Sequence, residues 1–218
     1  KNTALVLSSF VAIILLGIIL VVFFQSFESF SRYGLKFLVT SEWNPVKDEY
    51  GAFTAIYGTL VTSFLSLLIT IPLGVGTAIF ITEDFVPKVV REIIGSFVEL
   101  LAAIPSVVLG LWAIFVMEPF FRAFFVFLHN FFGWIPLFST EPTGRNSLLA
   151  ILILVVMLLP IVTSIARDSL NQVPKKLRNA AYGIGASRWK TIFSVILPAA
   201  LSGIMAGVLL ALGRAMGE

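Results

Sequence analysis

Cysteine is missing from this chain of 218 residues, and histidine occurs once, at His129. Without thiols there are no disulfides, no cysteine nucleophile and no thiolate metal site, and a single imidazole cannot form a multi-histidine metal cage. We therefore expect no metal site and no catalytic residue. A Gly-x4-Gly-Lys-Ser/Thr phosphate loop is also absent from the sequence, so we expect the chain to bind no nucleotide cofactor itself.

Charge is scarce as well, since only 12% of the residues are charged and the net charge is +3. Soluble domains carry about 25% charged residues, and nucleic-acid binders cluster basic residues far more strongly. By contrast, 58% of the residues are hydrophobic, and the chain has 21 Phe. A soluble fold of this size cannot bury so much apolar surface, so the composition indicates a membrane protein.

Long apolar runs predict the membrane crossings. The hydrocarbon core of a bilayer is about 30 Å thick, which requires about 20 apolar residues in a helix. Five runs meet this requirement: 4–24, 55–81, 93–117, 147–166 and 192–213. We expect an all-α, polytopic helical membrane protein, with a first transmembrane helix and outer loop over 1–54 and a core over 55–218. The chain begins without Met and ends at Glu218 without a stop signal, so we expect both ends to be truncated.

Lys and Arg residues in the connections predict the side of the membrane that each connection faces. The connections 82–92 and 167–190 hold eight of these residues in 35 positions, whereas 25–54 and 118–146 hold five in 59. Cytoplasmic loops are enriched in Lys and Arg, so we expect the first pair inside, with a cytoplasmic amino terminus. The aromatic segment 120–138 would invert this arrangement if it crossed. We therefore expect it to form an interfacial or re-entrant helix on the outer face.

One connection, residues 167–198, has features of a docking surface. Pro174 can open a short helix outside the bilayer, and Ala180 and Ala181 favour helix and give it a small surface. Gly185 then allows the chain to bend back toward the membrane. Such a surface permits close approach by a larger partner, but a plain cytoplasmic loop fits the composition equally well.

The same connection resembles a known motif. The run Ala180-Ala181-x3-Gly185-x9-Val195-x-Leu197-Pro198 is similar to the EAA loop of ABC-importer permeases, Glu-Ala-Ala-x3-Gly-x9-Ile-x-Leu-Pro. Asn179 stands where Glu is usual and cannot form a salt bridge to a basic residue of an ATPase. The resemblance implies that residues 167–198, called the coupling loop below, contact an ATPase. The residues it assigns to this contact are Asn179, Ala180, Ala181, Gly185, Leu197 and Pro198.

Further stretches resemble one branch of these permeases, the phosphate-specific PstC type. They are the run from Glu99 to Trp112, the Ala-Ala-Tyr-Gly-Ile-Gly run and the ending Ala-Leu-Gly-Arg-Ala-Met-Gly-Glu218. The resemblance covers most of 55–218. It implies a type I ABC-importer permease fold in a bacterial or archaeal cell membrane, with five of six transmembrane helices present here. It also implies a PstA-type partner permease, two copies of an ATPase that binds ATP, and an extracytoplasmic phosphate-binding protein.

Ionisable residues near the carboxyl end are candidates for a substrate path. Arg214 and Glu218 are spaced i, i+4 on one helix face, and Arg214 lies about 24 Å along a helix beyond Pro198. Charged groups at membrane depth are costly and usually face a polar interior, although a self-satisfied ion pair is the alternative. Ser106 follows Pro105, where a restarted helix would present N–H groups to an oxyanion, unless this is an ordinary proline kink.

Small residues recur every fourth position along the last predicted helix, at Ala199, Gly203, Gly207, Ala211 and Ala215. Such a stripe lets two helix backbones approach closely. We interpret Gly203, Gly207 and Ala211 as a surface for packing against the partner permease. Packing inside this chain is an equally acceptable interpretation.

Three functional classes compete at this point. A permease subunit of an ATP-driven phosphate importer explains the coupling loop, which an ion-driven transporter or a channel would not need. A membrane-embedded enzyme is disfavoured, because the sequence has no His-Glu-x2-His and no Gly-x-Ser-x-Gly motif. The assignment of phosphate as the substrate rests on the resemblance alone, because an Arg side chain and helix N-termini would also bind sulfate, molybdate or phosphonate.

Overall fold

The structure is a computed structural model that describes residues 2–139, 141 and 146–218. Contacts between residues divide it into two units, 1–58 and 59–218, which are described separately. The elements of the first unit are α1 (Asn2–Tyr33), α2 (Lys36–Val39), β1 (Trp43–Asn44) and β2 (Glu49–Tyr50). The two strands pair antiparallel, with Trp43 opposite Tyr50. Arg32 forms an ion pair with Asp48, which ties the end of α1 to this hairpin.

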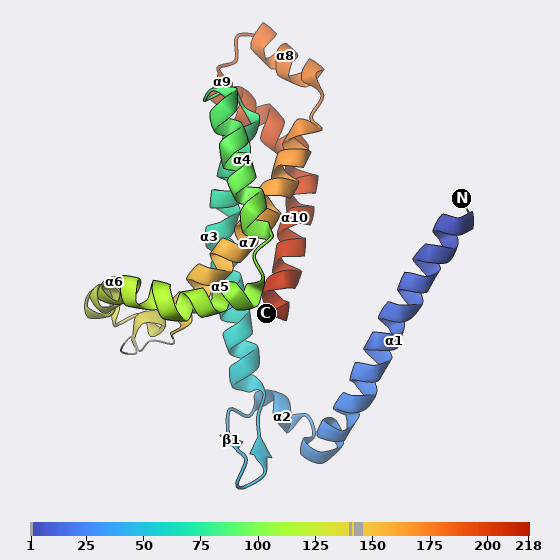
Figure 1. Cartoon of the computed structure of the whole chain (residues 1–218), viewed down its shortest axis with the longest axis vertical. Helices are drawn as coiled ribbons and strands as arrows, with labels where there is room; N and C mark the ends of the chain where they lie inside the picture. Colours follow the sequence, from blue (N-terminus) through green and yellow to red (C-terminus); the bar gives the residue numbers. More distant parts are fainter. Residues whose placement is uncertain (1, 140, 142–145) are drawn as a thin grey trace. The chain divides into compact units, whose positions relative to one another are not determined.

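In the described residues of the second unit, helices are the only regular secondary structure, and turns join them. Its helices are α3 (Phe53–Thr82), which begins in the first unit, α4 (Lys88–Ala102), α5 (Ser106–Trp112), α6 (Glu118–Phe132), α7 (Ser147–Asn171), α8 (Lys175–Gly183), α9 (Arg188–Thr191) and α10 (Leu197–Gly217). They are joined by two π-helical segments, η1 (Ala113–Met117) and η3 (Ile192–Ile196), and by the 3-10 turn η2 (Pro136–Phe138). Within this unit α7 packs against both α4 and α10, and its contact with α10 is the most extensive between any two helices (Figure 1).

Each π-helical segment ends two residues before a proline. Pro119 follows η1 and Pro198 follows η3. Proline has no N–H, so the carbonyl four residues before it loses its usual helical donor. The helix is locally wider over the five residues that contain this carbonyl, which is how a π-bulge relieves such a break.

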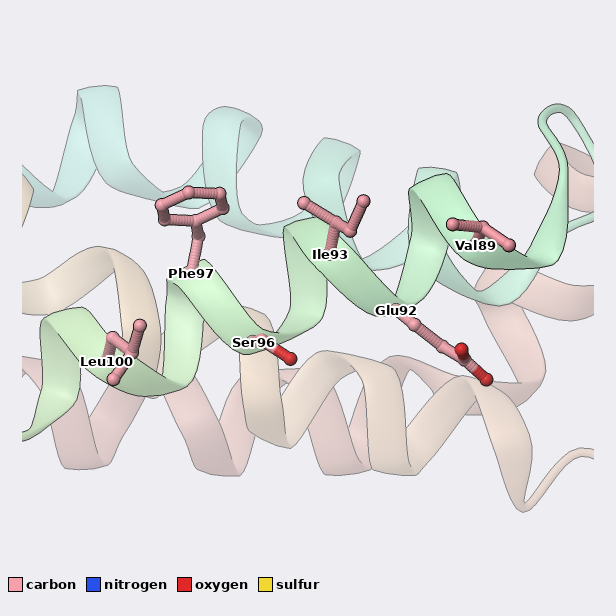
Figure 2. A pocket seen from close by; sticks show the side chains of 6 residues that line it. All are labelled: Val89, Glu92, Ile93, Ser96, Phe97 and Leu100. Carbon is pink, nitrogen blue, oxygen red and sulfur yellow. The ribbon is translucent and has the colours of Figure 1, made fainter.

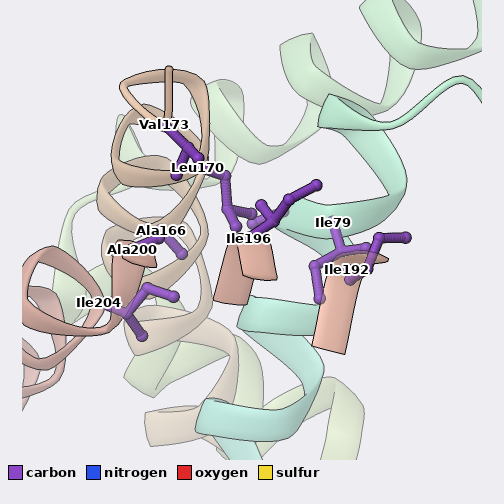
Figure 3. Packing of buried hydrophobic residues seen from close by; sticks show 9 residues of the cluster. Ile79, Ala166, Leu170, Val173, Ile192, Ile196, Ala200 and Ile204 are labelled. Carbon is purple, nitrogen blue, oxygen red and sulfur yellow. The ribbon is translucent and has the colours of Figure 1, made fainter. Parts of the chain in front are cut away.

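Three clusters of buried apolar side chains hold the second unit together. The first cluster joins Ile79 of α3 and Leu170 of α7 to Ile192 and Ile196 of η3 and Ile204 of α10 (Figure 3). Ile192 and Ile196 are 0% exposed, so the start of α10 is fixed where the coupling loop returns. The side chains of the second cluster come from α5, η1, α6 and the first half of α7. Those of the third cluster come from α3, α7 and the second half of α10.

Five helices in the described residues are long and apolar enough to cross a membrane: Leu5–Tyr33, Phe53–Thr82, Ser106–Phe132, Ser147–Asn171 and Arg188–Gly217. The predicted all-α architecture with five such helices is therefore confirmed, and four of the five predicted runs lie in these helices.

The third predicted run is wrong as a single helix. Residues 93–117 do not form one span, because α4 ends at Ala102 and α5 begins at Ser106 after Pro105. A proline N atom cannot continue the ladder and its ring crowds the preceding turn. The continuous helix instead runs from Ser106 to Phe132 and takes in most of the aromatic segment 120–138. In Figure 1 this helix runs across the direction of α4, α7 and α10.

Candidate functional site

The short helix and glycine bend expected in the coupling loop are both present. α8 begins after Pro174 and ends at Gly183. Gly185 has φ +83°, a left-handed conformation that residues with a Cβ adopt at a cost. The turn is closed by backbone hydrogen bonds from Gly185 N to Tyr182 O at 2.9 Å and from Ala186 N to Ala181 O at 3.0 Å. Residues 175–186 therefore form a defined surface rather than an open loop.

The two alanines of the motif lie on different sides of α8. Ala180 is exposed, as is Asn179, whereas Ala181 is only 5% exposed and faces the rest of the chain. The expectation that Ala181 lines the docking surface is therefore wrong. Consecutive residues are about 100° apart on a helix, so both could not share a face fully. Of the two alanines, only Ala180 is open to close approach by a partner.

An exposed apolar strip flanks Ala180. Leu177 is 45% exposed and Ile184 is 87% exposed, at positions i and i+7 around Ala180 at i+3. These three residues, two in α8 and Ile184 directly after it, are called the outward strip of α8 below. Leu177 and Ile184 were missed at the sequence level, although their i, i+3, i+7 spacing is the usual signal of one helix face. Of the other motif residues, Gly185 and Pro198 are exposed, and Leu197 packs partly against the first cluster.

The inward side of α8 is held by an ion pair that sequence reasoning also missed. Arg178 pairs with Glu83, which directly follows α3, and its side chain is 19% exposed while that of Glu83 is 8% exposed. Arg178 Nη2 also donates to the carbonyl of Leu170, near the end of α7, at 2.9 Å. A single guanidinium thus joins α8 to both α3 and α7. The available signal was two adjacent carboxylates, Glu83 and Asp84, directly after an uncharged helix.

A second set of contacts joins α9 to the same turn. Arg188 Nη1 donates to the carbonyl of Asp84 at 2.8 Å, and its guanidinium lies 5.4 Å from the centre of the Phe85 ring. Trp189 stacks on Phe85 with the ring centres 5.0 Å apart. The Asp84 carboxylate pairs with Arg91 of α4 at 2.7 Å. The turn between α3 and α4 therefore contacts the coupling loop on both sides of the glycine bend.

Two of the three predicted substrate-path residues, Arg214 and Glu218, lie at the carboxyl end of α10, which is away from α8 (Figure 1). Arg214 Nε and Glu218 Oε1 are 3.7 Å apart, and their side chains are 40% and 31% exposed. Ser106 begins α5, where the N–H groups of Val108 and Leu109 donate to the Pro105 carbonyl at 3.0 and 3.2 Å. Within the described residues Ser106 makes no hydrogen bond to Arg214 or Glu218. Two of the three predicted residues are thus brought together.

The small-residue stripe of α10 packs within the chain, against α7. A Cβ at Gly203 would overlap the Ser169 hydroxyl, and a Cβ at Gly207 would lie 2.9 Å from Ile165. Ala211 and Ala215 are buried in the third cluster with side chains of α3 and α7. The interpretation of Gly203, Gly207 and Ala211 as a surface for the partner permease is therefore wrong. The small residues are needed because two helices of the same chain approach closely here.

A shallow groove of about 320 Å³ lies along α4 (Figure 2). The residues that line it are Val89, Glu92, Ile93, Ser96, Phe97 and Leu100. A polar groove of about 390 Å³ shares Glu92 and Ser96 with it and is also lined by Lys88, Arg91 and Arg167. Each cation of this second groove is paired with a carboxylate: Arg167 with Glu99 at 3.4 Å, Lys88 with Glu92 at 3.4 Å, and Arg91 with Asp84, which does not line the groove, at 2.7 Å. The cations that line these grooves are therefore already engaged in ion pairs.

Comparison with protein families places most of the chain in one of them. Residues 71–218 match the family described as "binding-protein-dependent transport system inner membrane component". A relative from Mesorhizobium japonicum, "phosphate transport system permease protein PstC", is 42% identical over 95% of this chain and 65% of its own length. A second protein of that name from Pasteurella multocida is 39% identical over 100% of this chain and 69% of its own length. The chain thus spans about two thirds of the length of these relatives.

A more distant relative and a solved structure extend this result. "Probable ABC transporter permease protein YqgH" from Bacillus subtilis is 37% identical over 89% of this chain and 59% of its own length. Among solved structures, a chain of the MetNI methionine ABC transporter in inward-facing conformations matches with a TM-score of 0.60 and 20% identity. That match covers 74% of this chain and 68% of the solved one. Together with the family match, this shared fold shows that the chain has the type I ABC-importer permease fold.

Proposed function

The chain belongs to the family of binding-protein-dependent transport system inner membrane components, in its PstC type, and we propose that it is a permease subunit of an ATP-driven phosphate importer. It is a multi-pass membrane protein by its family and its five apolar helices. In this proposal it lies in a bacterial or archaeal cell membrane with its amino terminus in the cytoplasm. It does no bond chemistry and binds no cofactor itself.

The observation that carries this proposal is the construction of the coupling loop. The outward strip of Leu177, Ala180 and Ile184 is exposed, while Arg178 and Ala181 hold the adjoining side of α8 to the chain. An exposed apolar strip on a firmly held helix suits a docking contact with another protein. We infer that this protein is the ATPase, in two copies per transporter. The remaining partners are a PstA-type permease and an extracytoplasmic phosphate-binding protein.

Phosphate as the substrate is supported by two observations. The relatives that match the whole chain carry the name of phosphate permeases. Arg214 carries a planar guanidinium, which can bind an oxyanion through two parallel N–H bonds. Its pairing with Glu218 at 3.7 Å is loose and partly exposed, which leaves the guanidinium available to a competing anion. Sulfate, molybdate and phosphonate are the alternative substrates.

Reconstitution tests the proposal. The full-length chain is expressed with its partner permease, ATPase and binding protein, and uptake of radiolabelled phosphate into proteoliposomes is measured with and without ATP. We expect uptake to require both ATP and the ATPase, and unlabelled sulfate or molybdate in excess to compete poorly. Uptake that persists without the ATPase and follows an ion gradient would show an ion-driven transporter instead. Strong competition by another oxyanion would reassign the substrate.

A further inference from the structure

The turn between α3 and α4 is positioned to receive movement from the coupling loop. It meets the loop twice, through Glu83 and Arg178 before the glycine bend, and through Asp84, Phe85 and Arg188 after it. The two contacts differ in exposure. Trp189, which stacks on Phe85, is 58% exposed, whereas the Glu83 side chain is 8% exposed. The Glu83–Arg178 contact is therefore the more enclosed and more constrained of the two.

The Glu83–Arg178 pair constrains α8 in two directions. Arg178 binds the Glu83 carboxylate through Nη1 and the Leu170 carbonyl through Nη2, so the planar guanidinium is fixed between α3 and α7. Separating a buried pair leaves an uncompensated charge, which is strongly unfavourable. A displacement of α8 must therefore carry the ends of α3 and α7 with it.

The outward strip and the buried pair are joined by the same short helix. Leu177, Ala180 and Ile184 are exposed, whereas Arg178 and Ala181, three residues apart, share the buried side, about 100° around the helix axis from the strip. A partner that is docked on the outward strip and displaces α8 therefore displaces the guanidinium with it. From α3 and α7 the movement reaches the first cluster, in which Ile79 and Leu170 pack against Ile192 and Ile196.

We propose that Glu83 and Arg178 are positioning residues that transmit movement of the docked ATPase from α8 to α3 and α7. This inference rests on the proposed function, because it presumes an ATPase on the outward strip. It assigns to a side-chain pair within this chain a role in coupling that differs from docking itself. Loss of the pair should leave docking and ATP hydrolysis in place while fewer phosphate ions are moved per ATP.

The test compares two adjacent carboxylates. Glu83→Gln removes the buried charge with little change in shape, and Asp84→Asn makes the same change at the next residue, which is exposed and pairs with Arg91. Arg178→Lys keeps the charge but cannot reach both Glu83 and the Leu170 carbonyl with one planar group. ATP hydrolysis and labelled phosphate uptake are measured on the same assembled complex in proteoliposomes, with complex abundance quantified separately.

We expect the ratio of uptake to hydrolysis to fall about tenfold in Glu83→Gln and Arg178→Lys, within the range found for coupling contacts, and to stay near normal in Asp84→Asn. Exchanging the charges, with Glu83→Arg and Arg178→Glu together, should recover part of the ratio. A purely structural role would lower complex abundance and leave the ratio unchanged, which would overturn the inference. An equal fall in Asp84→Asn would overturn it as well.

The wild-type complex separates this inference from the proposed function. If wild-type complex shows no ATP-driven phosphate uptake, the proposed function fails and the inference fails with it. If wild-type uptake is normal and Glu83→Gln leaves the ratio unchanged, only the inference fails.

Discussion

Two arginine–carboxylate pairs mark opposite ends of the helical core, and they differ in burial. Arg178 and Glu83, at the coupling-loop end, have side chains 19% and 8% exposed. Arg214 and Glu218, at the far end of α10, have side chains 40% and 31% exposed and approach only to 3.7 Å. Breaking a buried pair by removing one partner costs about 3–5 kcal/mol, whereas an exposed pair contributes about 0–1 kcal/mol.

This difference fits two kinds of task. A pair that is costly to break holds two elements together while they move, as required at the α8 contact. A pair that is cheap to separate can release its arginine to a competing anion. On the roles proposed above, the same two residue types would serve as a fixed connection at one end and as an exchangeable one at the other. Four sets of variants test the comparison.

The largest loss of stability is expected for Arg178→Ala. Removing the guanidinium leaves the nearly buried Glu83 carboxylate without its partner, which should lower the free energy of unfolding by about 3–5 kcal/mol. Thermal unfolding of the purified chain in detergent measures this. Lys88→Ala serves as the control, because the Lys88–Glu92 pair is 81% and 65% exposed and should contribute little. Equal losses in both variants would contradict the difference between buried and exposed pairs.

Gly207→Leu tests the core that connects the two ends. Its Cβ would lie 2.9 Å from Ile165 Cβ, so the larger side chain must push α10 away from α7. Overpacking of this kind costs about 1–3 kcal/mol or more. Gly213→Leu is the matched control on the same helix, since a Cβ at Gly213 meets nothing within 4 Å. Lowered melting temperature in Gly207→Leu and not in Gly213→Leu is the expected result in detergent.

The two alanines of α8 should respond oppositely to the same change. Ala181→Trp forces a large ring into a buried position and should destabilise the chain by about 1–3 kcal/mol. Ala180→Trp adds the ring on the exposed outward strip, so the melting temperature should stay near normal while the ATPase no longer copurifies. Melting curves and copurification from the same membranes give both readouts. An ATPase that still copurifies with Ala180→Trp would exclude this strip as its docking surface.

Arg214→Ala should have the smallest effect on stability and still abolish transport. The exposed pair contributes about 0–1 kcal/mol, so complex abundance and melting should hardly change. Uptake of labelled phosphate should be lost, Arg214→Lys should retain little, and Glu218→Gln should alter rate more than substrate range. Near-normal uptake in Arg214→Ala would leave the pair as a structural contact and turn attention to the Pro105–Ser106 break.

Much of the architecture could be read from the sequence because the signals are local. The apolar runs that contain Ile79 and Leu158 are long enough to predict the helices α3 and α7 from their length alone. Gly185 predicts the bend, because the bend has a φ of +83° that favours glycine. The sequence showed the break at Pro105, but it did not show that a separate long helix, Ser106–Phe132, begins there. A missing N–H interrupts a helix, and where the next helix runs depends on what it packs against.

The candidate site was predicted less completely. The motif spacing located α8 and the i, i+4 rule located Arg214 beside Glu218. Spacing does not reveal which side of a helix faces its own chain, so Ala181 and Gly207 were both assigned to partner surfaces although they are buried.

The sequence by itself determined the membrane class, the number of long apolar helices, the family motif and the position of the bend, because composition and short-range spacing suffice for each. Tertiary structure alone decided that Glu83 pairs with Arg178, 95 residues further along the chain. It also decided that the small-residue stripe of α10 packs against α7. Contacts between distant residues depend on how whole helices pack, and helix packing is set by the combined shape of many side chains rather than by any single motif.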